Sequence, residues 1–196
     1  MPVPTSGPLT RDELRLYWRG IRKLEGLRGR CLRLHLLTGG QRIDQLVRLR
    51  WSDVPPDAIT IIDVKGRPGQ GARSRTVPLP PEAAREMKAA ERHGKYVMSS
   101  AGGTKPISGT TLSGWAQEAV ADVVDEFQLK RVRSGVETLL AAQGVNREVR
   151  GHRQSHGLTG VQARHYDGHD YMPEKRRALD VLLAAIEPLK RRRAGS

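Results

Sequence analysis

The chain has 196 residues, a formal net charge of +13, one cysteine and a hydrophobic fraction of 37%. This length predicts one domain, and the hydrophobic fraction is sufficient for a folded core and too high for a typical disordered polycation. One cysteine excludes an intramolecular disulfide, and the sequence has no cysteine and histidine cluster of the kind that holds structural zinc. We therefore expect a folded, cytoplasmic protein.

The excess of positive charge creates a field that attracts polyanions, of which nucleic acid is the commonest. Anionic lipid as a partner, or solubility alone, would also explain the charge. We do not expect a membrane span, because no apolar run approaches the ~18 residues needed to cross a bilayer. We do not expect secretion, because the start of the chain, MPVPTSGPLT, lacks the charged-then-apolar pattern of a signal peptide.

The first part of the chain has helical periodicity. Thr10 is the predicted N-cap of a helix over residues 11–24, which carries acidic residues in its first turn. A second helix is predicted from about residue 27 to a break at a glycine pair, with Cys31 in the core. A third helix is predicted over residues 42–51, where a segment with two prolines ends it.

The period then changes from helical to extended. Residues 58–64 are short and β-branched, and residues 73–79 form a second extended run, so we predict a hairpin with a long basic turn. A helix is predicted over residues 81–92, followed by a third short strand at residues 96–98. A loop over residues 99–108 then leads to the second half of the chain.

The second half is predicted to be mostly helical. The helices are expected over residues 109–127, 130–144, 146–154, 161–166 and 173–187. The first of them contains four acidic residues and no Lys or Arg over residues 110–127, so we expect it to face away from a polyanion. The predicted fold class is α+β, mainly α-helical with a small antiparallel β-sheet. Residues 10–189 are the expected domain, between an N-terminal linker (1–9) and a basic tail (190–196).

Candidate functional residues fall in separate blocks. They are Arg42 after a glycine pair, Lys65 at a strand end, Lys130 and Arg133 before an apolar helix, and His156 and Tyr166, ten residues apart. The stretches of sequence at or near these residues include Leu36-Leu37-Thr38-Gly39-Gly40-Gln41-Arg42-Ile43, Thr76-Val77-Pro78-Leu79, Ser155-His156-Gly157 and Ala163-Arg164-His165-Tyr166-Asp167. In order and spacing these blocks resemble the catalytic domain of the tyrosine recombinases, the phage integrase family. The resemblance runs from Leu9 to the last predicted helix.

The resemblance implies the tyrosine recombinase catalytic-domain fold and site-specific DNA recombination, meaning integration or excision. In that reaction Tyr166 attacks a scissile phosphate, forms a 3′-phosphotyrosine and releases a 5′-hydroxyl, with no metal or other cofactor. Arg42 and Arg133 are then the clamp on the phosphate, Lys65 is the general acid for the leaving oxygen, and His156 contacts the phosphate.

The residue types also suit this chemistry on physical grounds. Attack on a phosphodiester adds charge to its nonbridging oxygens, and planar guanidinium groups stabilise that charge in the transition state. A tyrosine with a pKa of ~10 is mostly protonated at neutral pH, so it needs a base or cationic surroundings to attack.

Two positions depart from the family pattern. Lys130 stands where many members have histidine, which keeps a donor but changes the proton chemistry, and we interpret it as a phosphate contact or proton shuttle. Gln45 stands where members often have an acidic residue three positions after the first arginine. The sequence therefore leaves open how Arg42 is held in place.

Alternatives remain for several assignments. Arg67, Arg73 and Arg75 share the loop or strand of Lys65, His152 is the fallback for His156, and Tyr171 is the rival of Tyr166. At the level of function, the alternatives are a noncatalytic DNA-binding relative and DNA relaxation of the type IB topoisomerase kind.

Double-stranded DNA is the partner that the resemblance implies, with self-association as a tetramer on DNA. The apolar stripe of the last helix, within residues 173–189, is either core or a contact with a neighbouring protomer. Family members carry an N-terminal domain that clamps the other face of DNA, and we expect this chain to lack it. The resulting DNA binding should be weak and strongly salt-dependent.

Overall fold

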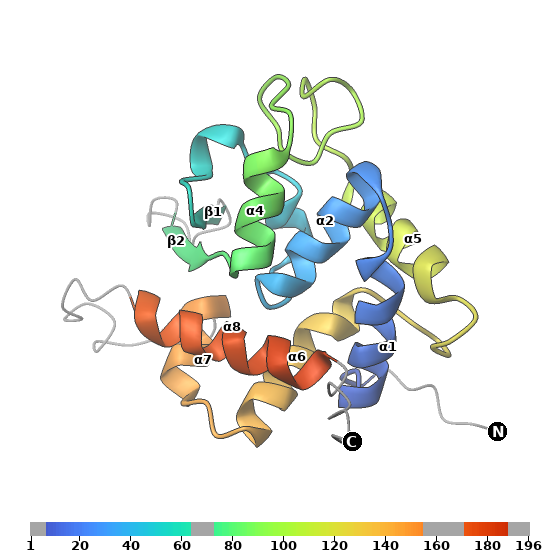
Figure 1. Ribbon diagram of the computed structural model, residues 1–196, viewed down its shortest axis with the longest axis vertical. Coiled ribbons are helices and arrows are strands. Elements are labelled where there is room, and N and C mark those ends of the chain that lie inside the picture. Colours follow the sequence, from blue (N-terminus) through green and yellow to red (C-terminus); the bar gives the residue numbers. More distant parts are fainter. Residues whose placement is uncertain (1–6, 64–72, 155–170, 188–196) are drawn as a thin grey trace, which may run out of the picture.

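The computed structural model describes residues 7–63, 73–154 and 171–187, and Figure 1 shows a mainly helical fold with a small hairpin at one side. The helices are α1 (Arg11–Arg22), α2 (Gly26–Leu37), α3 (Ile43–Leu46), α4 (Pro81–Ala89), α5 (Gly109–Val120), α6 (Lys130–Ala142), α7 (Arg147–Gln154) and α8 (Met172–Ile186), with the 3-10 helix η1 (Trp51–Asp53). The strands are β1 (Ala58–Asp63) and β2 (Arg73–Pro78). The predicted α+β class is confirmed.

The start of α1 is fixed by a capping box. The Thr10 hydroxyl accepts from the amide of Glu13 at 3.2 Å, and the Glu13 carboxylate accepts from the amide of Thr10 at 2.7 Å. Two of the donors left open at a helix N-terminus are thereby satisfied. The predicted N-cap is confirmed, and the helix that follows buries Tyr17 and Trp18.

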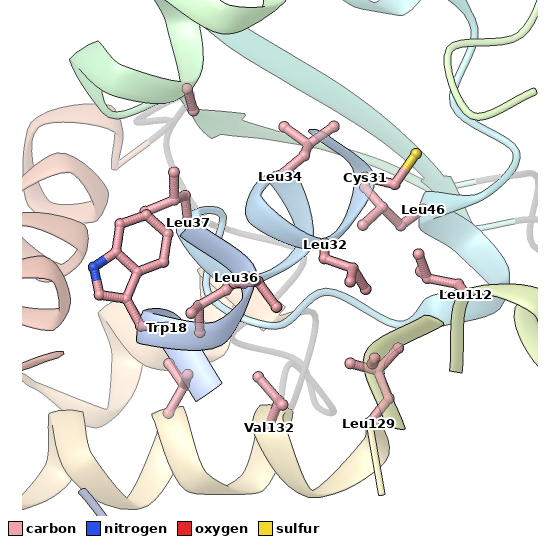
Figure 2. Close-up of a cluster of buried hydrophobic side chains, with 14 of the residues drawn as sticks. Trp18, Cys31, Leu32, Leu34, Leu36, Leu37, Leu46, Leu112, Leu129 and Val132 are labelled. Atoms are coloured by element: carbon pink, nitrogen blue, oxygen red, sulfur yellow. The ribbon is translucent and has the colours of Figure 1, made fainter. Parts of the chain in front are cut away.

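The core surrounds α2. Figure 2 shows the α2 leucines spreading in several directions, with Trp18 of α1 beside Leu36 and Leu37, and Val132 of α6 facing them. A helix that is apolar on most sides is typical of a buried position, and α2 packs against α1, α4 and α5. Cys31 is 1% exposed, which confirms its predicted place in the core.

The strands form the predicted hairpin. β1 and β2 pair antiparallel from Ala58 opposite Pro78 to Asp63 opposite Arg73. The third strand predicted at residues 96–98 is wrong: the segment forms only an isolated bridge between Arg50 and Tyr96. The amide of Tyr96 donates instead to the carbonyl of Gly103 at 3.1 Å, so this backbone closes a local loop and does not extend the sheet.

Several helices are shorter than predicted. The helix expected over residues 42–51 is the single turn α3, because the chain leaves the helix to form the bridge at Arg50. The helix expected to residue 127 ends at Val120, since the chain folds back and Gln117 donates to the carbonyl of Phe127 at 3.2 Å. Apolar periodicity alone did not locate these ends, which are set by tertiary contacts.

The last helix, α8, lies alongside α1, α6 and α7 and also contacts β2 (Figure 1). Its apolar stripe is buried within the same chain, at Ala178, Leu179, Leu182, Ala185 and Ile186. Of the two interpretations of this stripe, the structure supports the core. None of the described helices combines the length and the hydropathy that a bilayer crossing requires.

Candidate functional site

A cleft of about 810 Å³ opens between α3, the end of β1 and the first turns of α5 and α6. Three predicted site residues line it: Arg42, Lys130 and Arg133. Arg42 and Lys130 are exposed and Arg133 is half-buried. The other predicted site residues, Lys65, His156 and Tyr166, lie outside the described residues.

The turn before Arg42 brings these residues together. Gly40 has a φ of +72°, and a Cβ there would lie 2.9 Å from the Cα of Arg133. Only a glycine allows this close approach of the turn to α6. The carbonyl of Gly40 then accepts from Nη1 of Arg133 at 3.3 Å. Residues about 90 positions apart in the chain thus form one end of the cleft.

The charge around Arg133 is strongly positive. Burial, together with the nearby charges of Arg42, Arg75 and Arg153, lowers the pKa of Arg133 to about 9, while Glu137 acts in the opposite direction. The group stays charged at neutral pH. An anion bound here would relieve the repulsion between the guanidinium groups, so the site favours anionic ligands.

Arg75 on β2 belongs to the same cluster, and the sequence offered it only as a rival to Lys65. Its Nη2 donates to Oε1 of Gln41 at 2.9 Å and to Oε1 of Gln45 at 2.8 Å. Gln45 therefore holds Arg75. Because the two acceptors are neutral amides, they orient the guanidinium without cancelling its charge. The sequence signal that could have indicated Arg75 is the two-residue period of a strand, because Val77 lies on the same face of β2 and is buried.

His35 supports the turn from α2. Its Nε2 lies 3.0 Å from the carbonyl oxygen of Gln41, and His35 is among the residues that line the cleft. Burial lowers the pKa of His35 to about 4, so the ring is neutral and Nε2 donates to the carbonyl. Sequence reasoning missed this histidine because its neighbours on α2 are apolar.

Acidic side chains are also present at the cleft. Asp44 and Asp63 line it. Burial lowers the pKa of Arg75 to about 10, and the charge of Asp63 acts in the opposite direction. The described residues contain no group of three or more side chains that could hold a metal ion. The first turn of α5, which carries no charged residue, lines the cleft. Glu118, near the C-terminal end of the same helix, pairs with Arg28 at 2.9 Å.

The two alternative residues, His152 and Tyr171, contact each other. Their rings stack with centroids 4.1 Å apart, and the hydroxyl of Tyr171 donates to Glu148 at 3.0 Å. This contact joins α7 to the start of α8. Neither residue is among those that line the cleft.

Solved structures share this architecture. The integrase from mycobacterium phage Brujita has a TM-score of 0.66 at 17% identity, covering 96% of this chain and 66% of that one. The site-specific recombinase XerH bound to its difH substrate has a TM-score of 0.58 at 14% identity, with coverages of 76% and 47%. The lambda integrase tetramer bound to a Holliday junction has a TM-score of 0.55 at 20% identity, with coverages of 82% and 48%.

This chain has the tyrosine recombinase catalytic-domain fold. The fold expected from the sequence blocks is therefore confirmed. No protein-family model matches the sequence, and no curated protein matches it either. The chain spans about two thirds of the phage Brujita integrase and about half of the other two proteins.

Proposed function

We propose that this chain is the catalytic domain of a site-specific DNA recombinase that cleaves and rejoins strands through a 3′-phosphotyrosine. The observation that carries the proposal is the convergence of Arg42, Lys130 and Arg133 on one cleft, within a recombinase fold. These residues were singled out from blocks far apart in the sequence. Their meeting at a single cleft is what a phosphate clamp requires.

In this proposal the scissile phosphate binds between Arg42 and Arg133. Guanidinium groups donate two parallel hydrogen bonds to phosphate oxygens, and a partly buried cleft strengthens these bonds as charge develops in the transition state. Lys130, at the first residue of α6, adds a further donor. Arg75 adds to the positive charge near Arg133, and the neutral side chains of Gln41 and Gln45 hold its guanidinium in place.

The remaining roles follow from the family resemblance. We assign Tyr166 as the nucleophile, Lys65 as the general acid for the leaving 5′ oxygen, and His156 as a phosphate contact. The positive field of the cleft would favour the tyrosinate that attacks. Tyr171 is a poorer nucleophile, because its ring and hydroxyl are engaged by His152 and Glu148.

Double-stranded DNA is the proposed substrate, as the net charge of +13 favours and as the DNA-bound XerH structure suggests. A tetramer is the proposed assembly, by analogy with the lambda integrase on a Holliday junction. Its protein contacts would use surfaces other than the stripe of α8, which the chain itself covers. Residues 10–189 remain our proposed boundaries of the catalytic domain.

Incubation with a nicked suicide substrate tests the proposal. The wild-type protein should form a covalent protein–DNA complex that survives denaturation, and Tyr166→Phe should abolish it. Tyr171→Phe is the matched control, because it removes the same hydroxyl five residues away and should leave the complex. If only Tyr171→Phe abolishes the complex, the nucleophile is Tyr171 and our assignment of Tyr166 is wrong. DNA binding with no complex in the wild type would favour a noncatalytic relative.

A further inference from the structure

Arg153, near the end of α7, is a fully buried arginine, with a relative exposure of 0%. Burying a guanidinium charge is costly unless the charge is compensated. Among the described residues, Glu137 is the one carboxylate paired with it, at 3.6 Å from Nη2, and Glu137 also pairs with Arg150. Such sparse compensation argues against a purely stabilising role for Arg153.

The side chain of Arg153 ends beneath the turn that precedes Arg42. Its Nη1 donates to the carbonyl oxygen of Gly39 at 2.5 Å. Gly39 has a φ of +88°, and a Cβ there would lie 1.8 Å from that same Nη1. The glycine is therefore needed both for the backbone conformation and for the space that the guanidinium occupies.

The main chain of Arg153 holds the same turn at a second point. Its carbonyl oxygen accepts from Nε2 of Gln41 at 3.2 Å, and that amide also donates to the carbonyl of Thr38 at 2.7 Å. Gln41 is fully buried. One residue of α7 thus fixes Gly39 with its side chain and Gln41 with its backbone.

These two fixed residues lie on either side of Gly40. Gly40 accepts from Arg133 at 3.3 Å, and Arg42 directly follows Gln41 as the residue before α3. A shift of this turn would therefore move both arginines of the proposed clamp relative to each other. Misplacement of catalytic groups by about 1 Å can cost about 100-fold in rate.

We propose that Arg153 is a positioning residue that holds the turn between Arg42 and Arg133 in the conformation that phosphate cleavage requires. It acts through Gly39 and Gln41, and it is not among the residues that line the cleft. The inference rests on the proposed function, which assigns the phosphate to these two arginines. The charge of Arg153 also adds to the positive potential at Arg133, whose pKa it helps to lower.

Arg153→Met tests the inference, because methionine is unbranched like the aliphatic part of arginine but lacks the guanidinium. Arg150→Met is the matched control: Arg150 is on the same helix and pairs with the same Glu137, but its other bond is to Val145. At saturating nicked DNA we expect the rate of covalent complex formation to fall about 100-fold in Arg153→Met. The DNA affinity of this variant and the rate of the control should stay close to wild type. Arg153→Lys should recover part of the lost rate.

Hydrogen exchange at the amide of Gly40, which donates to the carbonyl of His35 at 2.9 Å, gives a readout that needs no reaction. This amide should exchange faster in Arg153→Met than in the wild type or the control. A folded Arg153→Met variant with wild-type rate and wild-type exchange would overturn the inference. If Arg153→Met does not fold, Arg153→Lys decides by the same two readouts. If the wild type forms no covalent complex, the proposed function fails, and the exchange data alone decide whether Arg153 holds the turn.

Discussion

Replacing Arg133 with alanine is expected to lower the rate of covalent complex formation by about 10³-fold, the loss seen when a preorganised donor to a developing charge is removed. Arg133 is half-buried, fixed by the carbonyl of Gly40, and surrounded by like charges that a phosphate would neutralise. Arg133→Lys keeps the charge but loses the planar pair of donors, so its rate should fall between those of the alanine variant and the wild type.

The measurement is single-turnover kinetics on a nicked duplex at saturating protein, with DNA affinity determined separately. Arg177→Ala is the control, because it removes the same charge from an exposed side chain on α8 that pairs with Glu174. It should change the affinity slightly and the rate hardly at all. A rate for Arg133→Ala within a few-fold of that control would remove Arg133 from the clamp.

Gly39→Ala is expected to lower the free energy of unfolding by about 3 kcal/mol, the sum of left-handed backbone strain and of overpacking against a buried group. The added Cβ would lie 1.8 Å from Nη1 of Arg153, and the φ of +88° is unfavourable for alanine. Urea denaturation of the two proteins, followed by circular dichroism, measures this difference.

Two further variants separate the strain from the contact. Gly102→Ala has a similar φ of +62° but no atom within 4 Å of its Cβ, so it should cost only about 1 kcal/mol. Combining Gly39→Ala with Arg153→Met should cost less than the sum of the two single changes, since the shorter contact partner relieves the clash. Equal costs at Gly39 and Gly102, with strict additivity, would contradict the close contact described here.

The sequence was sufficient for features that depend on local chemistry. The Thr10 cap, the hairpin and the core position of Cys31 follow from residue type and spacing over a few positions, and all are confirmed. The expectation that Arg42 and Arg133 belong to one site came from the family resemblance. The structure brings them to a single cleft, and their roles there remain predictions.

Features that depend on tertiary contacts were not predictable in this way. Arg75 and Arg153 resemble any other arginine in a chain with 34 basic residues, and only the packing of β2 and α7 against one turn distinguishes them. Residues 96–98 have the composition of a strand, but the amides of Tyr96 and Val97 donate to the carbonyls of Gly103 and Leu49 and not to a neighbouring strand of the sheet. Gln45 is a similar case, because its partner, Arg75, is 30 residues away.

The central claim is that Tyr166 attacks a phosphate held in this cleft. The most direct test is to digest the covalent complex formed on a nicked substrate and to identify the residue linked to DNA by mass spectrometry. We predict a phosphate ester on Tyr166, with the DNA joined through its 3′ end. A link at Tyr171 or any other residue, a 5′ linkage, or no link from a protein that binds and folds normally, would contradict the account.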